Sequence, residues 1–322
     1  MKPLPRLRIA HLPTPVETLP RLSAALRGPN LLVIRDDATG LAFGGNKTRK
    51  LEYLLAEAQA NGARTLVTTG AVQSNHCRQT AAAAARFGFD CILVLAGESP
   101  QTPSANLLLD RLLGAELVWT DRARRDQTLQ QVFQSAWDAG RRPYLVPYGG
   151  SSTTGAAAYV AAFLELVEQG VQPDWIVFAS SSGGTQAGLA LGARLAGFQG
   201  KLLGISVDEQ AQTLQTRVAD LSNATADVLG EGASRRLSPD DILVNDQFLG
   251  AGSGIPGEAE IEAIGLFARH EGLLLDPVYT GRAAAGLVSL ARTGVFGQGE
   301  QVLFWHTGGT PALFADAYRQ LF

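Results

Sequence analysis

TLVTTGAVQSNHCRQTAAAAARFGFDCILVLAG, residues 65–97, predicts a β-strand, a helix and a second β-strand in direct succession. The strands are predicted at 65–70, which ends at a glycine, and at 91–97, because both runs are apolar. The intervening segment 75–87 contains five consecutive alanines, the residue with the highest helix propensity. A strand, a covering helix and a second strand form a βαβ unit, which indicates a parallel sheet and an α/β fold.

The same alternation continues along the chain, so we expect parallel sheets with helices on both faces. Segment 221–253 has weaker periodicity and is read as connecting loops. Further strands are predicted at 116–120, 143–150, 174–180, 201–207 and 301–309. Further helices are predicted at 104–113, 125–139, 154–169, 184–196, near 256–269, at 281–292 and after residue 309.

Length and composition exclude several classes of protein. A chain of 322 residues fits two compact lobes, and 46% hydrophobic with 18% charged residues is typical of a globular protein. The net charge of −3 argues against a nucleic-acid-binding surface. No apolar run reaches the roughly 18 residues of a membrane span, and the N-terminus has no apolar core of a secretory signal. We expect a cytoplasmic protein without membrane or nucleic-acid partners.

The cysteine and histidine patterns predict no metal site. Cys77 and Cys91 have no metal-binding spacing and are expected to be buried as small apolar residues. The four histidines form no paired-ligand motif.

Ligands of such sheets bind beyond the carboxyl ends of the strands. Segments rich in Gly, Ser, Thr and Asn, or leading from a loop into a helix, therefore mark the candidate site. These segments are 43–50, 69–76, 180–188, 276–281 and 305–310.

Lys47 lies in the first of these segments, FGGNKTRKLEYLLAEAQANG (43–62). Asn46 is a plausible N-cap of the helix that follows, which would place Lys47 in the first turn. The helix dipole there disfavours a cation, and nearby Arg49 and Lys50 add like charge, so we expect a lowered pKa and a nucleophilic amine. A solvated basic patch or a phosphate clamp explains the lysine equally well. A nucleotide-binding P-loop is disfavoured, because one extra residue separates the last glycine from the lysine.

Two other segments offer ligand-binding groups. SSSGGTQAG (180–188) follows a predicted strand, and its backbone N–H groups at a helix N-terminus favour an anion site over an ordinary loop. In TTGAVQSNHCRQTAAAAA (68–85), Ser74 or Asn75 is expected to cap the helix, although both could also face a ligand.

Together these motifs resemble a known family. GLAFGGNKTRKLEY, AVQSNHCRQTAA, SSSGGTQAG, DPVYTG and HTGGTPALF occur in this order, and the resemblance runs from about residue 8 to the C-terminus. The chain is similar to the D-cysteine desulfhydrases and 1-aminocyclopropane-1-carboxylate (ACC) deaminases, which are pyridoxal-phosphate (PLP) enzymes of fold type II, like the tryptophan synthase β subunit.

The resemblance implies a role for each matching residue. Lys47 matches the lysine that carries PLP as a Schiff base and takes the Cα proton. Ser74 and Tyr279 match groups beside the substrate, and Asn75 matches the amide that contacts the pyridoxal 3′-oxygen. The implied phosphate site consists of Lys50, Ser181, Ser182, Gly183, Gly184 and Thr185. Thr307 matches the side chain that faces the pyridine nitrogen, where a neutral hydroxyl can donate a hydrogen bond.

Two positions favour one branch of the family. Thr280 and Thr307 resemble the D-cysteine desulfhydrase pattern, whereas ACC deaminases carry Glu and Leu there. The implied reaction is α,β-elimination of D-cysteine to pyruvate, sulfide and ammonia. The alternatives are ACC deamination, elimination from another β-substituted amino acid such as cysteate, and PLP binding without turnover, which the presence of Ser74, Asn75 and Tyr279 disfavours.

The resemblance also implies an architecture of two open, mostly parallel twisted sheets, with helices on both faces and PLP in the cleft between the domains. Residues 1–48 and 156–322 would form the larger PLP-binding domain, and 49–155 a smaller inserted α/β domain. The expected substrate is a small amino acid, and the expected assembly is a homodimer.

Overall fold

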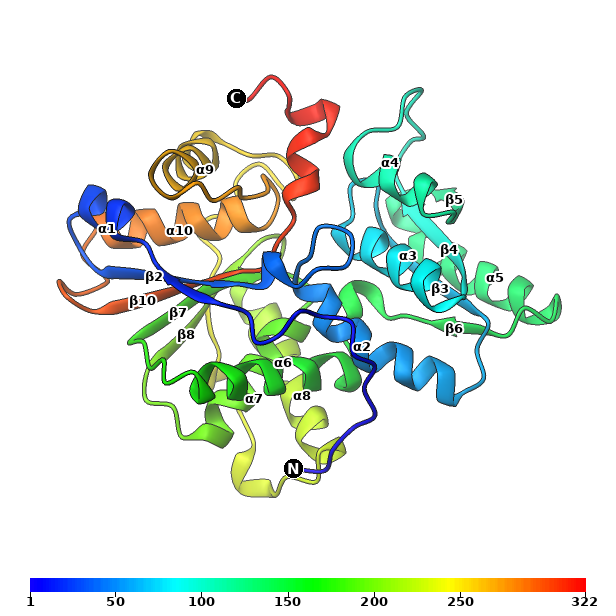
Figure 1. The fold of residues 1–322 in the computed structure, drawn as a ribbon, viewed down its shortest axis with the longest axis horizontal. Coiled ribbons are helices and arrows are strands. Elements are labelled where there is room, and N and C mark those ends of the chain that lie inside the picture. The colour runs from blue at the N-terminus through cyan, green and yellow to red at the C-terminus, as the bar shows by residue number, and fades with distance from the viewer.

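The protein contains two β-sheets, one of six strands and one of four (Figure 1). The computed structural model describes residues 1–322, apart from the side chain of Ser234. The strands are β1 (Val16–Thr18), β2 (Asn30–Arg35), β3 (Thr65–Ala71), β4 (Asp90–Ala96), β5 (Glu116–Thr120), β6 (Pro143–Leu145), β7 (Trp175–Ser180), β8 (Lys201–Ser206), β9 (Leu243–Asn245) and β10 (Gln301–His306). The α-helices are α1 (Pro20–Leu26), α2 (Asn46–Ala60), α3 (Asn75–Phe87), α4 (Ala105–Leu112), α5 (Arg125–Asp138), α6 (Thr153–Glu168), α7 (Gly184–Ala196), α8 (Ala211–Val228), α9 (Glu258–Glu271) and α10 (Thr280–Arg292).

The larger sheet has the strand order β1-β2-β10-β7-β8-β9, and all its pairs are parallel except the one between β1 and β2. One face packs against α1, α9 and α10, and the opposite face packs against α6 and α7 (Figure 1). Both layers are apolar: Phe304 belongs to the first core and its chain neighbour Trp305 to the second. Burial on both faces is typical of a parallel sheet.

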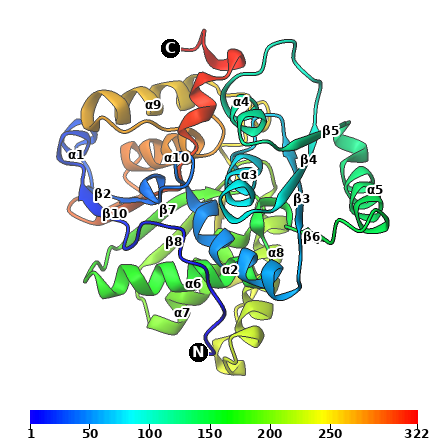
Figure 2. The same cartoon turned by 45° about the vertical axis from the view of Figure 1, so that its right-hand side comes forward.

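The smaller sheet has the order β5-β4-β3-β6 and is wholly parallel. Helix α5 covers one face, while α2, α3 and α4 contribute to the core on the other face (Figure 2). All four strands lie within residues 49–155.

Helix α2 connects the two halves, because it packs against α6 of the larger sheet and α3 of the smaller one (Figure 1). The residue at its start therefore lies between the two sheets.

The elements predicted between residues 65 and 207 are confirmed, with differences of one or two residues at most ends. Strand β6 is shorter than predicted: it stops at Leu145, and Tyr148–Gly150 forms a 3-10 turn with Gly149 at φ 63°. The predicted C-terminal helix is wrong, since two short 3-10 turns, Thr310–Phe314 and Asp316–Tyr318, follow β10. Helix α8 overlaps the segment that the sequence analysis assigned to loops.

Cys77 and Cys91 are free and buried, as predicted. Among the described side chains, no three His, Cys, Asp or Glu residues cluster closely enough to hold a metal ion. None of the helices described combines the length and apolar character needed to cross a bilayer.

Candidate active site

A cavity opens where strands of both sheets end, at β3 of the smaller sheet and at β7 and β10 of the larger. It encloses about 700 Å³, counted with its open mouth. All five segments predicted from the sequence contribute to it. The lining consists of Asn46, Lys47, Ala71, Ser74, Asn75, His76, Tyr148, Gly149, Ala179, Ser180, Ser181, Ser182, Gly183, Thr185, Tyr279, Thr307 and Gly308.

Lys47 points into this cavity from the first turn of α2. Asn46 is the first helical residue, so its prediction as N-cap is wrong: the N-cap is Gly45, at φ 119°. The Asn46 amide instead donates to Thr185 Oγ1 at 3.1 Å. This bond joins the start of α2 to the start of α7, so it fixes the position of the Lys47 amine relative to the loop before α7.

The Lys47 side chain is half-buried, and burial lowers the pKa of its amine to about 8. The predicted contributions of Arg49 and Lys50 are wrong, because burial alone lowers the pKa of Lys47. Arg49 forms ion pairs with Asp36 and Glu165 that neutralise its charge. Burial first, and then Lys47, hold the pKa of Lys50 well below its usual value. A lysine with a pKa near 8 is about one-tenth neutral at pH 7, enough to act as a nucleophile.

The rate at which PLP attaches to the apoprotein is expected to rise with pH through about 8 and to level off above it. The neutral amine is the nucleophile, and its fraction grows as the pH passes the pKa. Stopped-flow absorption from pH 6 to 9.5 measures this rate, with Lys47→Ala as the blank. A rate that still rises about tenfold per pH unit at pH 9.5, as an ordinary lysine with a pKa of 10.5 would give, would contradict the prediction.

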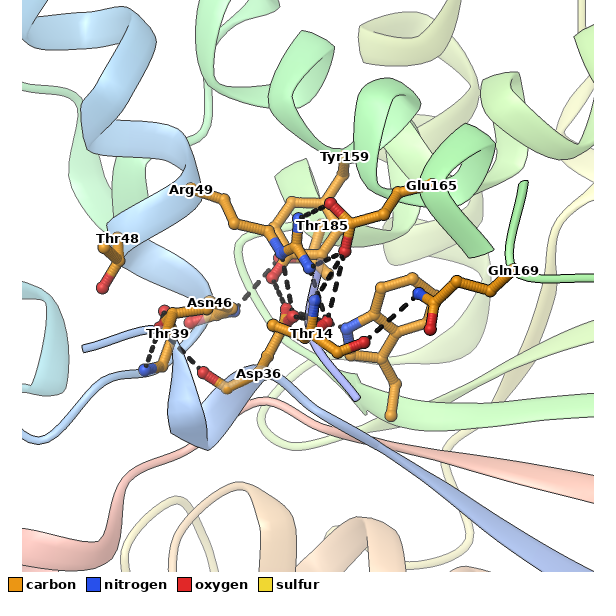
Figure 3. Close-up of polar contacts among 12 residues, drawn as sticks. Thr14, Asp36, Thr39, Asn46, Thr48, Arg49, Tyr159, Glu165, Gln169 and Thr185 are labelled. Carbon is orange, nitrogen blue, oxygen red and sulfur yellow. Dashed lines mark hydrogen bonds and ion pairs between the residues drawn. The ribbon is translucent and has the colours of Figure 1, made fainter. Parts of the chain in front are cut away.

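A buried network fixes the helix that carries Lys47 (Figure 3). Arg49 donates from Nε to Asp36 Oδ1 at 2.8 Å and from Nη2 to Glu165 Oε1 at 2.8 Å. Asp36 is fully buried and also accepts from the Tyr159 hydroxyl and from Trp305 Nε1 at 2.8 Å. Asp36 follows β2, while Glu165 and Tyr159 lie on α6, so the network ties α2 to the larger sheet and its covering helix.

Ser74 is the N-cap of α3, as the sequence suggested: its Oγ accepts from Cys77 N at 3.2 Å. Asn75 follows it on the cavity wall. The Asn75 side-chain oxygen accepts from Arg78 Nη1 at 3.3 Å and from Asn106 Nδ2 at 3.0 Å. Because its oxygen is held in this way, the Asn75 amide nitrogen is the group available to the cavity.

The loop before α7 forms a cradle in which several hydroxyls already have partners. Ser181 donates to Asp208 Oδ2 at 2.8 Å, and Ser182 Oγ lies 2.7 Å from Ser151 Oγ. Gly184 lies behind the cavity wall, and its N–H donates to Ser151 Oγ at 3.1 Å. Gly183 has φ 86°, which a glycine adopts without strain and which lets the backbone approach a ligand closely.

Lys50 is fully buried outside the cavity lining. Its ammonium group donates to the Gly149 carbonyl at 3.1 Å and lies 5.9 Å from the centre of the Tyr159 ring. Since Gly149 itself lines the cavity, one peptide unit separates Lys50 from the site.

Tyr279 lies at the start of α10 and lines the cavity. Burial holds the pKa of its hydroxyl well above the usual value, so this group keeps its proton at neutral pH. The fully buried Asp276 carboxylate positions it by accepting from Tyr279 N at 2.7 Å. Thr280 does not line the cavity: its hydroxyl donates to Asp276 Oδ2 at 2.8 Å. Thr280 therefore acts on the site through the helix start.

Thr307 follows β10 and lines the cavity opposite the smaller sheet. Its carbonyl accepts from Asn46 N at 3.0 Å, which ties the end of β10 to the start of α2. Beyond it, Gly309 has no room for a side chain, because a Cβ there would lie 2.5 Å from Asp276 Oδ2 and 2.8 Å from Asn75 Nδ2.

Eight residues of the lining were not predicted as site residues: Asn46, Ala71, His76, Tyr148, Gly149, Ala179, Ser180 and Gly308. His76 Nε2 lies 2.9 Å from Thr68 Oγ1, and burial holds its pKa well below the usual value. The pair at 148–149 was assigned to a strand, although PYGG after an apolar run is a turn signal.

The residues present fit pyridoxal phosphate by chemical type. Lys47 provides an amine, the loop before α7 an anion cradle, and Asn75 an amide donor. Across the described part of the chain, no carboxylate lines the cavity, so the neutral Thr307 hydroxyl is the group that suits an unprotonated pyridine nitrogen.

Comparison with known proteins identifies the family of the chain. The family model described as "Pyridoxal-phosphate dependent enzyme" matches residues 7–308. A D-cysteine desulfhydrase of Salmonella choleraesuis (strain SC-B67) is 42% identical over 97% of this chain and 96% of the relative. A D-cysteine desulfhydrase of Yersinia enterocolitica is 43% identical over the same shares. A crystal structure titled as an ACC deaminase homologue superposes with a TM-score of 0.90 at 36% identity, covering 99% of this chain and 97% of the other, which confirms the predicted fold class. The chain therefore belongs to the family of pyridoxal-phosphate dependent enzymes.

Proposed function

We propose that this enzyme catalyses the α,β-elimination of D-cysteine to pyruvate, sulfide and ammonia. The observation that carries the proposal is the 42% identity to D-cysteine desulfhydrase over 97% of the chain. The cavity supports it, since Thr307 is a neutral donor and a weak electron sink suits a reaction in which a good leaving group drains the electrons.

Lys47 is proposed to hold the cofactor and, once displaced by the substrate amine, to remove the Cα proton. When bound, PLP withdraws electrons from Cα of the amino acid. The pKa of about 8 lets the Lys47 amine work as a base near neutral pH. Loss of the Cα proton and of the Cβ thiolate leaves an unsaturated amino acid, which takes up water to give pyruvate and ammonia.

The loop Ser181–Thr185 is proposed to bind the cofactor phosphate through its backbone N–H groups and the Thr185 hydroxyl. Asn46 supports this, because its amide donates to Thr185 Oγ1 and leaves the hydroxyl hydrogen free for an anion. Lys50 is proposed to act through the Gly149 peptide, whose carbonyl it holds behind the phosphate. Asn75 is proposed to donate to the 3′-oxygen.

Ser74 and Tyr279 are proposed to face the substrate. Ser74 Oγ is held as a helix cap, and Tyr279 keeps its phenolic proton because its pKa is raised. Ser74 would then orient the carboxylate and Tyr279 would assist proton transfer to or from the thiol.

Tyr279→Phe is expected to lower kcat by about 100-fold, the lower range for loss of an acid–base group, and to leave PLP affinity within about threefold. The substitution removes the hydroxyl that is proposed to face the substrate. The ring and the hydrogen bond from Tyr279 N to Asp276 remain. Steady-state kinetics and a PLP titration check this. An unchanged kcat would reduce Tyr279 to a packing role.

Thr307→Glu is expected to lower the ratio of elimination to slower Cα reactions, such as loss of configuration, by at least about tenfold, or about 1.4 kcal/mol. A carboxylate at the pyridine nitrogen would hold it protonated and stabilise the carbanion. Product analysis and the spectrum of bound PLP measure the effect, with Thr307→Ser as control. Wild-type products and spectrum would disprove the proposed role of Thr307.

ACC deamination is the second candidate, because a solved structure titled as an ACC deaminase homologue has the same fold. Purified, PLP-loaded protein should be offered D-cysteine, L-cysteine, cysteate and ACC in parallel. Pyruvate and sulfide from D-cysteine alone are expected. Ammonia and 2-oxobutyrate from ACC, or turnover of cysteate alone, would overturn the substrate assignment and leave the PLP site intact.

We further propose that residues 1–48 and 156–322 form one domain and 49–155 the other. The connection of α2 to both sheets supports closure of one sheet on the other around substrate. A cytoplasmic homodimer is the proposed state, and sedimentation analysis would test the dimer.

A further inference from the structure

Arg78 is a fully buried cation on α3, directly behind the cavity wall. Its Nη1 donates to Asn106 Oδ1 at 2.8 Å and to Asn75 Oδ1 at 3.3 Å, and its Nη2 donates to the Gly44 carbonyl at 3.0 Å. One side chain therefore holds both the Asn75 amide and the turn that precedes Lys47.

We propose that Arg78 is a positioning residue that turns the Asn75 amide toward the cofactor and favours the ionised form of the cofactor oxygen that this amide contacts. The inference rests on the proposed role of Asn75. The positive charge of Arg78 would then act on the cavity, although Arg78 is not one of its lining residues.

The orientation of Asn75 follows from its partners. An amide offers one acceptor oxygen and two donor hydrogens, and two donors, Arg78 and Asn106, compete for the oxygen of Asn75. Rotating the amide by half a turn would place its NH₂ group against these two donors. The bonds therefore hold the nitrogen toward the cavity, and binding of the oxygen to a cation strengthens the nitrogen as a donor.

The charge of Arg78 is not consumed by its own hydrogen bonds, because all three acceptors are neutral oxygens. Burial lowers the pKa of Arg78 to about 10, which still leaves it charged at neutral pH. Two carboxyl groups act on this charge from a distance: Asp110, whose pKa burial raises to about 8, and the buried Asp276, whose oxygens already accept from backbone N–H groups. They neutralise only part of the charge. A buried cation held by neutral groups is costly, and an anionic oxygen at Asn75 would compensate it.

The bond to Gly44 gives Arg78 a second role, which the experiment must separate. Ala42, Phe43, Gly44 and Gly45 all have positive φ, and the turn that they form leads directly into Lys47. The Gln79 side chain also donates to the Gly44 carbonyl, but it makes no hydrogen bond to the Asn75 side chain. Gln79→Met is therefore a matched control: it reports any effect on PLP binding that arises from the turn before Lys47 and not from Asn75.

The test compares PLP affinity and the visible spectrum of bound PLP in Arg78→Met, Asn75→Ala, the double variant and Gln79→Met. Arg78→Met is expected to weaken PLP binding about tenfold and to move absorption from the longer-wavelength band of the ionised form to the shorter one. In the double variant, PLP binding should be less than about threefold weaker than in Asn75→Ala alone, because the effects of coupled residues are not additive. Gln79→Met should keep the wild-type spectrum.

A wild-type spectrum in Arg78→Met, an equal change in Gln79→Met, or additive losses in the double variant would each overturn the inference. If Asn75→Ala alone has no effect while Lys47 still binds PLP, the proposed role of Asn75 fails first. Circular dichroism of each apoprotein checks folding. Should Arg78→Met not fold, Arg78→Gln decides, because it also removes the charge, and a wild-type spectrum in this variant would reject the proposal.

Discussion

Replacing Lys47 with alanine is expected to lower turnover of D-cysteine by at least about 10⁴-fold, because one side chain provides both the covalent link to the cofactor and the general base. The visible absorption of attached PLP should disappear at the same time. The cradle before α7, Asn75 and Thr307 remain, so the variant should still bind PLP without a covalent bond.

Two controls make this result specific. Lys201→Ala removes an exposed lysine whose ammonium group lies 4.4 Å from the Trp175 ring, and it should retain full activity. Adding a small primary amine to Lys47→Ala should restore part of the turnover if a missing base is the cause. Full activity in the variant without added amine would refute the assignment of the active site.

Replacing Arg49 with methionine is expected to lower the free energy of unfolding by about 3–5 kcal/mol, the typical cost of removing one partner of a buried ion pair. Asp36 would keep its bonds from Tyr159 and Trp305 but would lose its cation in a fully buried position (Figure 3). Since Arg49 is two residues from Lys47, the start of α2 should loosen as well. Urea unfolding of the apoprotein measures the change.

An exposed pair provides the matched control. Arg292 Nη2 lies 2.6 Å from Glu262 Oε1, and about half of each side chain is exposed. Arg292→Met should cost less than about 1 kcal/mol, because solvent screens exposed ion pairs. The double variant Asp36→Asn with Arg49→Met should recover part of the loss, since no unpaired charge remains between the two positions. Equal destabilisation in Arg49→Met and Arg292→Met would contradict the structural role of the network.

The regular elements between residues 65 and 207 were predictable because their periodicity, end signals and burial agree. Helix α3 is one example: Ser74 caps its start, alanines fill its middle, and Gly88 ends it at φ 74°. Each of these features is local in the sequence, so no knowledge of distant contacts was needed.

Other elements depend on contacts that local patterns do not encode. The buried face of α8 includes Ser222 and Thr225, and the Ser222 hydroxyl donates to the Ala187 carbonyl of α7. Small hydroxyl residues weaken an apolar stripe, so the part of this helix after residue 220 was read as a loop. Strand β2 was not predicted either. It pairs with β10, about 270 residues later in the chain, so the contact that stabilises it is not visible in the local sequence.

The residues of the candidate site also fall into two groups, those that local patterns predict and those that depend on distant contacts. The strand-end rule located Lys47, Asn75 and Thr307 from their segments, because parallel strands place their carboxyl ends at one edge. It gave no sign of Arg78, and it marked the segment that begins at Asp276 without a role for that carboxylate. Both side chains lie behind the wall and act by holding other residues. Residues of this kind are recognised only from their hydrogen bonds.

By itself the sequence determined an α/β fold, the family and a lysine in a first helical turn, because these depend on patterns that span a few dozen residues. Only the tertiary structure decided the chemistry of that lysine. Its pKa falls to about 8 through burial between two sheets, whereas the charge of Arg49 is neutralised by Asp36 and Glu165. Asp36 and Glu165 lie 13 and 116 residues from Arg49 along the chain, so folding alone brings the three charges together.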